Sequence, residues 1–306
     1  MGWGRMYFAA QAVAGAAWWL AIFLVPDIRV ATLGSLDPVL VAFADVPLFV
    51  IASALAAGGV RWAVLLATGW TAFVTVALAL YATVTMLAGW GVILMIAASI
   101  GSVVAACVTL LGRIPTRWIA IGPFRFRPAD PRPARSRIRA ATAAEIAVFW
   151  TVFLGVLPVA VVGLERRWQL GVAFGSVPVG VVLFVLGGAL GIWSAAVMSS
   201  QGGGTPLPSA MPNRLVIAGP YRFVRNPMAV GSILQGVAVG VLWSSWLVAA
   251  YAIAGAVLWH VVVRPEEEAD LEERFGDAFR RYRDGVRCWW PRWRPFTVIE
   301  AVGTAG

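Results

Sequence analysis

The sequence contains unusually little charge. Charged residues make up 13% of the 306-residue chain, about half of the share found in soluble domains, whereas 60% of the residues are hydrophobic. The mean hydropathy is +0.81. This balance excludes an ordinary soluble globular domain, and it predicts a polytopic membrane protein.

Cysteine and histidine are also scarce. The chain has two cysteines, Cys107 in an apolar run and Cys288 near the C-terminus, and a single histidine, His260. The cysteines fall on unlike elements without a partner spacing, and one histidine has no second imidazole with which to share a metal ion. We therefore expect neither a disulfide framework nor a metal site, and we expect His260 to be a packing or interface residue.

Long apolar runs are what the sequence has in abundance. A helix needs about 20 mostly apolar residues to cross the hydrocarbon core, and we count eight such runs, of which the last two are short. They cover residues 6–26, 39–57, 62–82, 87–111, 143–163, 171–198, 228–244 and 246–263. The first run is too long for a signal peptide and lacks a small-residue cleavage site before Pro26, so we expect a retained span. The last two nearly meet at Trp243–Trp246, which predicts a helical hairpin.

The distribution of basic residues predicts the topology. Lysine is absent, so all 24 basic residues are arginines. With a cytoplasmic N-terminus, eight spans place every arginine except Arg29, Arg166 and Arg167 on the cytoplasmic side, as the positive-inside rule requires. The C-terminus is then cytoplasmic too, and we expect an integral protein of a bacterial plasma membrane. This topology and contact with anionic headgroups explain the net charge of +9, so nucleic acid is not required as a partner.

A segment rich in Arg and Pro, residues 113–142, divides the chain. We expect residues 1–112 to form a four-span membrane region of unknown role, residues 113–142 a cytoplasmic linker, and residues 143–306 a second membrane domain. The linker arginines either contact lipid headgroups or solvate the segment. Asp45 stands inside an apolar run of the first region, where a carboxyl group is either a functional relay or hydrogen-bonded to a neighbouring helix.

Polar residues of the C-terminal half gather in two clusters, Arg214–Met228 before the hairpin and Arg264–Tyr282 after it. Because the ends of a hairpin lie close together, we expect the clusters to form one polar pocket at the cytoplasmic face. Apolar residues of the second cluster recur at helical spacing, which predicts an amphipathic cytoplasmic helix roofing this pocket. The stripe consists of Leu271, Phe275, Phe279 and Tyr282. The carboxylates Glu266–Glu268 suit a ligand with a positive charge and several hydrogen-bonding groups. The predicted fold is therefore all-α, with about eight transmembrane helices and one amphipathic helix.

At these positions the chain resembles a known family. The stretch LVIAGPYRFVRNPM, a two-span hairpin and then EEADLEERFGDAFRRY are similar to motifs of the membrane-embedded methyltransferases. This family includes isoprenylcysteine carboxyl methyltransferase and the phospholipid N-methyltransferases. The upstream GGGTPLP is similar to a bacterial branch of the family. The resemblance covers roughly residues 143–296 and rests on two ordered motifs at the right separation.

The resemblance implies transfer of a methyl group from S-adenosylmethionine to a lipophilic acceptor that enters from the bilayer. It implies a cytoplasmic cofactor pocket within residues 143–306. The residues that it assigns to cofactor binding are Leu215, Val216, Gly219, Tyr221, Arg225, Asn226, Pro227, Glu267 and Glu268. It places Arg264 near the acceptor and gives Asn226 a second, catalytic role. Asn226 stands where the family commonly has His, and Ala229 where it commonly has Tyr.

Asparagine keeps a donor and an acceptor but does not titrate near neutral pH. Methyl transfer from a sulfonium depends on alignment and a water-poor site more than on acid catalysis, so the replacement is compatible with activity. The acceptor group stays open between a carboxylate, a thiol and an amine.

Two other functions also stay open. One is an NADPH-dependent, sterol-type reductase sharing this pocket, in which the arginine-rich segment would bind a 2′-phosphate. The other is a non-enzymatic membrane protein for partner binding or transport. The scarcity of charge inside the apolar runs argues against an ion path.

Overall fold

A computed structural model describes residues 2–115, 135–202 and 213–297, and within these ranges all regular structure is helical. The predicted linker, residues 113–142, falls largely outside the described residues. The chain divides into two units, each compact by itself. The N-terminal unit comprises Met1–Pro115 and Gly163–Leu170, and the C-terminal unit comprises Thr116–Val162 and Gly171–Gly306. The first boundary between the units falls after Pro115, within the predicted linker, and residues 163–170 belong to the first unit, which was not expected.

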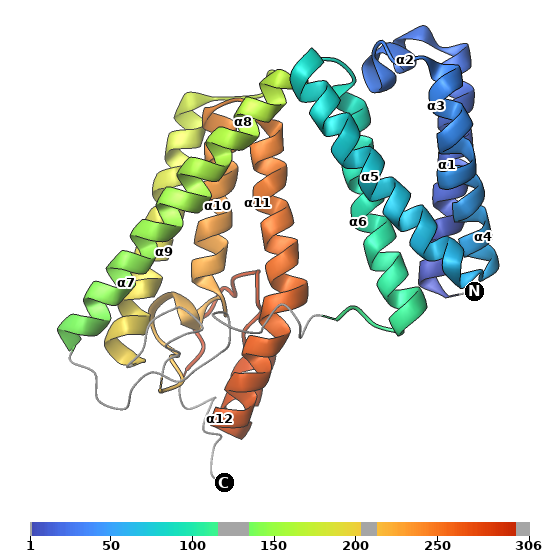
Figure 1. The fold of residues 1–306 in the computed structure, drawn as a ribbon. Helices are drawn as coiled ribbons and strands as arrows, with labels where there is room; N and C mark the ends of the chain where they lie inside the picture. The colour runs from blue at the N-terminus through green and yellow to red at the C-terminus, as the bar shows by residue number, and fades with distance from the viewer. Residues whose placement is uncertain (1, 116–134, 203–212, 298–306) are drawn as a thin grey trace. The chain divides into compact units, whose positions relative to one another are not determined.

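The N-terminal unit is a helical bundle (Figure 1). Its helices are α1 Trp3–Leu24, α2 Pro26–Leu33, α3 Pro38–Asp45, α4 Ala52–Gly58, α5 Arg61–Thr85 and α6 Gly89–Leu111. A π-helical turn, Val46–Ile51, joins α3 to α4, so that one helical stretch runs from Pro38 to Gly58. Proline occupies the first helical position of α2 and α3, where its missing N–H has no cost.

Asp45 is buried at the end of α3, at 7% exposure. The Trp19 indole N–H donates to Asp45 Oδ2 over 2.9 Å, and the Trp70 indole N–H donates to Oδ1 over 2.8 Å. Because α1 and α5 each contribute one donor, the carboxyl group joins three helical elements. Of the two roles expected for Asp45, the geometry favours a hydrogen-bonded structural carboxyl group.

The described part of the C-terminal unit is also helical. Its helices are α7 Arg135–Phe149, α8 Leu157–Arg167, α9 Val177–Gln201, α10 Pro227–Leu242, α11 Trp246–Leu258 and α12 Arg264–Gly285. Helix α8 belongs to this unit only as far as Val162. Two further stretches, Trp150–Val156 and Trp259–Val263, are π-helical turns. Helices α9, α10 and α11 lie side by side (Figure 1). Glycines allow the close approach of α9 and α10: a Cβ added to Gly187 would lie 2.7 Å from the carbonyl oxygen of Gly231. Small residues serve the same purpose in many membrane bundles.

Among the described residues, seven helical stretches are long and apolar enough to cross a bilayer. They are Trp3–Leu24, Pro38–Gly58, Arg61–Thr85, Gly89–Leu111, Ala140–Arg167, Val177–Gln201 and Trp246–Gly285. The prediction of a polytopic helical membrane protein is confirmed, but the expected span at 228–244 is the 16-residue helix α10. At 1.5 Å per residue α10 is about 24 Å long, shorter than the hydrocarbon core of about 30 Å. Helix α10 is therefore shorter than a full-length span, in agreement with its short apolar run.

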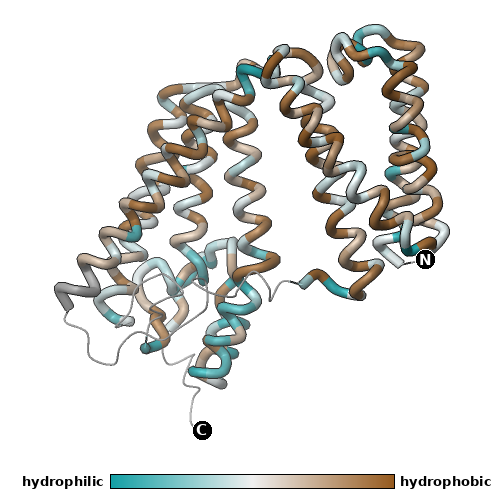
Figure 2. Tube along the Cα trace, in the orientation of Figure 1, coloured by the Kyte–Doolittle hydropathy of each residue, from teal (hydrophilic) through white to brown (hydrophobic). Residues whose placement is uncertain are grey.

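The last stretch, Trp246–Gly285, extends α11 directly into α12. A straight helix of 40 residues would be about 60 Å long, twice the thickness of the hydrocarbon core. Its apolar part ends at Val263, and the polar residues begin with Arg264, as Figure 2 shows by the change along the tube. We therefore take Trp246–Val263 as the membrane-spanning part and Arg264–Gly285 as the part outside the membrane.

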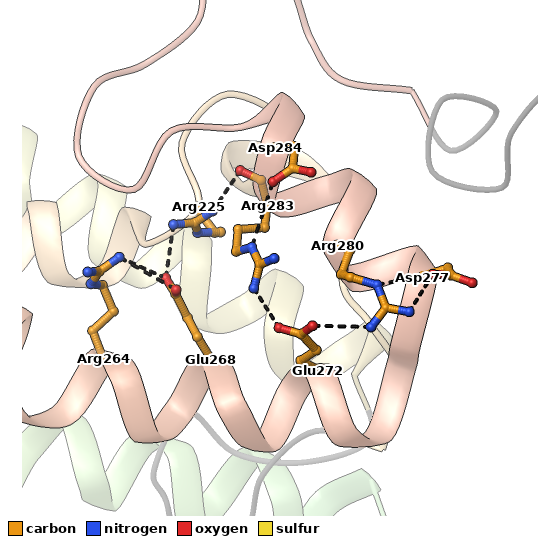
Figure 3. Close-up of polar contacts among 8 residues, drawn as sticks. All are labelled: Arg225, Arg264, Glu268, Glu272, Asp277, Arg280, Arg283 and Asp284. Carbon is orange, nitrogen blue, oxygen red and sulfur yellow. Dashed lines mark hydrogen bonds and ion pairs between the residues drawn. The ribbon is translucent and has the colours of Figure 1, made fainter.

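The predicted single amphipathic helix is wrong in one respect, because α12 breaks at Gly276. This residue has φ 53° and ψ −128°, a conformation that side chains with a Cβ rarely adopt. Glu272 forms ion pairs with Arg280, over 3.1 Å, and with Arg283. In a straight helix residues 11 apart would be about 16 Å apart, so the second limb of α12 folds back toward the first (Figure 3).

Candidate functional site

The site is a cavity between the segment before α10 and the two limbs of α12. An extended segment from Arg214 to Val216 forms one wall, followed by a 3₁₀ turn, Gly219–Arg222, and the start of α10. The first and second limbs of α12 close the opposite side. The lining side chains are Met198, Arg214, Leu215, Val216, Tyr221, Arg225, Asn226, Glu267, Glu268, Leu271, Phe279 and Tyr282. The two polar clusters that the hairpin was expected to bring together thus meet in one cavity.

The loop before α10 is fixed by special residues. Gly219 has φ +54°, and a Cβ there would lie 2.9 Å from Val197 Cγ2 on α9, so glycine satisfies both the backbone and the packing. Asn226 occupies the position before α10, and Pro227 is the first helical residue. The Tyr282 hydroxyl donates to the carbonyl oxygen of Tyr221 over 2.7 Å. The roof formed by α12 is therefore hydrogen-bonded to the loop that it covers.

Arg225 connects the loop to both ends of α12 (Figure 3). Its Nη2 donates to Glu268 Oε1 over 2.9 Å, and its Nη1 donates to the carbonyl oxygens of Arg283, at 2.8 Å, and Val286, at 3.3 Å. The last carbonyl groups of a helix lack partners within the helix, so the guanidinium satisfies acceptors that would otherwise remain open. Arg225 and Glu268 are only 10% and 16% exposed, which strengthens their interaction relative to a surface ion pair.

Arg264, expected near the acceptor, pairs with the same carboxylate. Its Nη1 lies 3.3 Å from Glu268 Oε1, and it is not among the residues that line the cavity. Glu268 is therefore held between two arginines. Both arginines thus contact Glu268 by an ion pair.

Glu267 differs from its neighbour. It lines the cavity, and no ion pair or hydrogen bond to its carboxyl group occurs among the described residues. Burial, together with the nearby Glu268 and Asp270 carboxylates, raises the pKa of Glu267 to about 7, although Arg225 acts in the opposite direction. The side chain of Glu267 is half-buried in the wall of the cavity, so the carboxyl group is poorly solvated. The cavity thus contains an unpaired acid that ionises near neutral pH.

Apolar contacts complete the roof. Phe279, Tyr282, Val286 and Phe296 form a buried cluster, against which Leu215, Ile217, Leu271 and Phe275 pack. The predicted apolar stripe therefore covers protein, the wall segment from Leu215 to Ile217, and not a lipid surface. Burial raises the pKa of the Tyr221 hydroxyl above its ordinary value, and the nearby Tyr282 and Glu267 act in the same direction, so Tyr221 stays protonated at neutral pH.

Most of the residues proposed from the sequence come together. Leu215, Val216, Tyr221, Arg225, Asn226, Glu267 and Glu268 line the cavity. Three of the proposed residues do not line the cavity but belong to the loop and helices that form its walls: Gly219, Pro227 and Arg264. The lining residues absent from the proposed set were Met198, Arg214, Leu271, Phe279 and Tyr282. Helical periodicity had marked Leu271, Phe279 and Tyr282 as a packing stripe, but no signal in the sequence pointed to Met198 of α9.

Comparisons with known proteins agree with this location. Residues 176–278, about a third of the chain, match the family model described as phospholipid methyltransferase. The matched segment is similar to that family. It begins one residue before α9 and ends inside the second limb of α12, so the phospholipid methyltransferase segment includes nearly every wall of the cavity.

One relative is a protein of Haemophilus influenzae that is described as uncharacterized. It is 37% identical to this chain over 51 residues, which amount to 15% of this chain and 81% of that protein. No solved structure matches the chain. The comparisons thus show a similarity to phospholipid methyltransferases over residues 176–278.

The chemistry of the cavity suits S-adenosylmethionine, the methyl donor implied by the sequence. An unpaired carboxylate, a tyrosine hydroxyl and an amide stand beside apolar walls, which matches a cation attached to a nucleoside. The described side chains enclose about 60 Å³, whereas small-molecule sites commonly measure about 300–1,000 Å³. This space holds a sulfonium-sized group, so a whole nucleoside requires the walls to move apart. Within the described residues, no group of three His, Cys, Asp or Glu side chains is arranged to hold a metal ion.

Proposed function

We propose that the protein transfers a methyl group from S-adenosylmethionine to a lipophilic acceptor that reaches the cavity from the bilayer. The observation that carries this proposal is the unpaired Glu267 carboxyl group, which faces a cavity walled by the phospholipid methyltransferase segment. The cavity lies a turn or so beyond the end of the apolar helix at Val263. A lipid with its reactive group at the headgroup level would therefore reach it without leaving the membrane.

Glu267 and Tyr221 would provide the polar contacts to the cofactor. A carboxylate with no arginine of its own attracts a positively charged ligand and accepts hydrogen bonds from its ammonium or hydroxyl groups. The protonated Tyr221 hydroxyl can donate in the same space. Leu215, Val216 and Leu271 offer apolar surface to the flat part of the ligand. When bound, the cofactor supplies a methyl group activated by a positively charged sulfur, which becomes a neutral thioether as the methyl group leaves.

Arg225 and Glu268 would act by positioning. Their ion pair holds the first limb of α12 against the loop that carries Tyr221 and Asn226, and Arg264 supports it from the membrane side. The resemblance assigned Glu268 and Arg225 to cofactor binding. The pairing supports a different division, in which Glu267 contacts the ligand and Glu268 fixes the wall.

Asn226 would contact the acceptor without exchanging a proton. Its Nδ2 lies 3.5 Å from Cys288 Sγ, a weak interaction that leaves the amide oxygen available toward the cavity. The cofactor held by Glu267 and Tyr221 would supply the methyl group, and Asn226 would orient the acceptor for methyl transfer. An acceptor that is already anionic or neutral, such as a carboxylate, a thiolate or an amine, needs only alignment and exclusion of water for this step.

Apolar helices surround the site on the membrane side, and the predicted topology would put both termini and the cavity in the cytoplasm. S-Adenosylmethionine is a cytoplasmic metabolite, so this orientation is the one compatible with the proposed activity. The family match does not support a reductase or a non-enzymatic function. One binding experiment tests both alternatives together with the methyltransferase.

The test is calorimetric titration of the purified protein in detergent with S-adenosylhomocysteine and, separately, with NADPH. We expect binding of S-adenosylhomocysteine that Glu267→Ala abolishes and that the matched control Glu266→Ala retains, since Glu266 does not line the cavity. Incubation with methyl-labelled S-adenosylmethionine and membrane lipid vesicles should then place the label in the lipid extract. Binding of NADPH alone would overturn the proposal in favour of the reductase, and no binding of either would favour the non-enzymatic protein.

A further inference from the structure

The segment after α12, Val286–Phe296, is held along the loop that walls the cavity. The backbone N–H of Arg225 donates to the carbonyl oxygen of Arg287 over 3.0 Å. In the other direction, the N–H groups of Arg292 and Phe296 donate to the carbonyl oxygens of Phe223 and Arg222, both over 2.9 Å. A shift of this tail segment would therefore also move the backbone of residues 222–225.

The tail segment buries one set of side chains and exposes another. Val286, Cys288 and Phe296 are buried, whereas Trp290 is 73% exposed and Trp293 is fully exposed. Arg287 and Arg294 are exposed beside them. The sequence from 286 to 297 contains no acidic residue. Two large aromatic side chains and two cations thus point away from the protein on a backbone that is fixed in place.

Side-chain contacts set the depth of the tail segment relative to the membrane. The Trp289 indole N–H donates to His260 Nδ1 over 2.8 Å, and the rings of Trp289 and Trp259 meet edge to face at 5.4 Å between centroids. Both partners belong to the π-helical turn Trp259–Val263, where the apolar part of the last span ends. The tail segment therefore lies at the level where hydrocarbon gives way to headgroups, which is where tryptophan is enriched in membrane proteins.

We propose that the tail segment is a contact site for anionic lipid headgroups, and that this contact holds the wall of the cavity in its binding geometry. Trp290 and Trp293 enter the interfacial layer of the bilayer, and Arg287 and Arg294 pair with anionic headgroups. Charge complementarity selects the occupant, because the segment carries only positive charge and the inner leaflet of a membrane carries negative charge. The effect on the cavity rests on the proposed function, whereas the lipid contact does not.

The lipid contact is tested in nanodiscs that contain phospholipids brominated near the headgroup, which quench the fluorescence of nearby tryptophan. Quenching should fall when Trp290 and Trp293 are both changed to Phe. The matched control is Trp62→Phe, in which quenching should be unchanged once the emission of Trp62 itself has been subtracted. Trp62 is an exposed tryptophan of the N-terminal unit. If the fluorescence removed by the double substitution shows no quenching in the intact protein, the two side chains do not enter the membrane and the proposal is wrong.

The effect on the cavity is tested by the affinity for S-adenosylhomocysteine in nanodiscs of phosphatidylcholine with and without phosphatidylglycerol. One arginine near an anionic surface is worth about a fivefold change in binding. We therefore expect phosphatidylglycerol to tighten the affinity several-fold in the intact protein and not in the double variant Arg287→Gln, Arg294→Gln. An equal lipid dependence in both proteins would overturn the inference. If the intact protein binds no S-adenosylhomocysteine in either membrane, the proposed function fails, while the quenching experiment still decides the lipid contact.

Discussion

Glu267 gives the cavity a defined dependence on pH. Its pKa in the free protein is about 7, against an ordinary value of 4.5. A cationic ligand beside the carboxyl group favours its ionised form, so the ligand binds best once Glu267 has lost its proton. With a pKa of about 7, roughly a tenth of the molecules are ionised at pH 6 and roughly nine tenths at pH 8. If only the ionised form binds, the affinity for S-adenosylmethionine should rise about tenfold over this interval.

Linkage gives a second measure of the same event. At pH 7 about half of the protein carries a proton on Glu267, so binding should release about half a proton per ligand. Calorimetry in buffers of different ionisation enthalpy measures this release. The stability of the free protein depends on pH in the opposite direction to the ligand affinity. A raised carboxyl pKa stabilises the fold at low pH, and this contribution is lost as the pH rises from 4.5 through about 7.

The matched control is Glu267→Gln, which keeps the size and the hydrogen-bonding capacity of the side chain but cannot titrate. The amino group of the ligand titrates equally with both proteins, so the difference between them isolates Glu267. The variant should bind more weakly at pH 8 and should lose most of the pH dependence. The reasoning is refuted if the affinity of the intact protein does not change between pH 6 and pH 8, or if the variant shows the same rise.

Three further substitutions test the frame of the site. Gly276→Ala should destabilise the fold by about 1–3 kcal/mol, measured by thermal unfolding, because alanine cannot adopt the backbone conformation of that break without strain. Arg225→Leu should weaken the binding of S-adenosylhomocysteine at least tenfold and lower the stability of the fold. The substitution removes a partly buried partner of Glu268 and leaves the carbonyl groups at the end of α12 without a donor. Unchanged binding would contradict the positioning role of Arg225. Trp70→Phe should cost about 1–3 kcal/mol by removing one donor to Asp45, without changing ligand affinity, since both residues belong to the N-terminal unit.

Much of the architecture could be predicted because it depends on composition over long windows. Apolar runs of about 20 residues have one stable state in a bilayer, the helix, since only a helix satisfies every backbone group within the segment. The meeting of the two polar clusters followed from the short connection between α10 and α11, which are separated only by residues 243–245. Neither inference required knowledge of side-chain contacts.

The features that were not predicted depend on single residues or on distant contacts. Gly276 lies inside the apolar stripe that predicts one amphipathic helix, and only its positive φ shows that the chain folds back there. Helix α10 ends at Leu242, where the turn through Ser244 and Ser245 begins, and the run of apolar residues does not by itself give the length of the helix. Met198 reaches the cavity from α9 through tertiary packing, for which local spacing holds no information.

The two adjacent glutamates show how the helix itself separates a binding role from a structural one. Successive residues of a helix point about 100° apart, so the carboxyl groups of Glu267 and Glu268 point in different directions although both residues line the cavity. Arg225 and Arg264 both reach Glu268, and this pairing leaves Glu267 without a cation of its own. If the arginines were shared equally, the cavity would contain no unpaired negative charge and would have no preference for a sulfonium. The pairing of Glu268 is therefore what makes Glu267 available, so Glu268→Gln should impair binding by freeing an arginine toward Glu267.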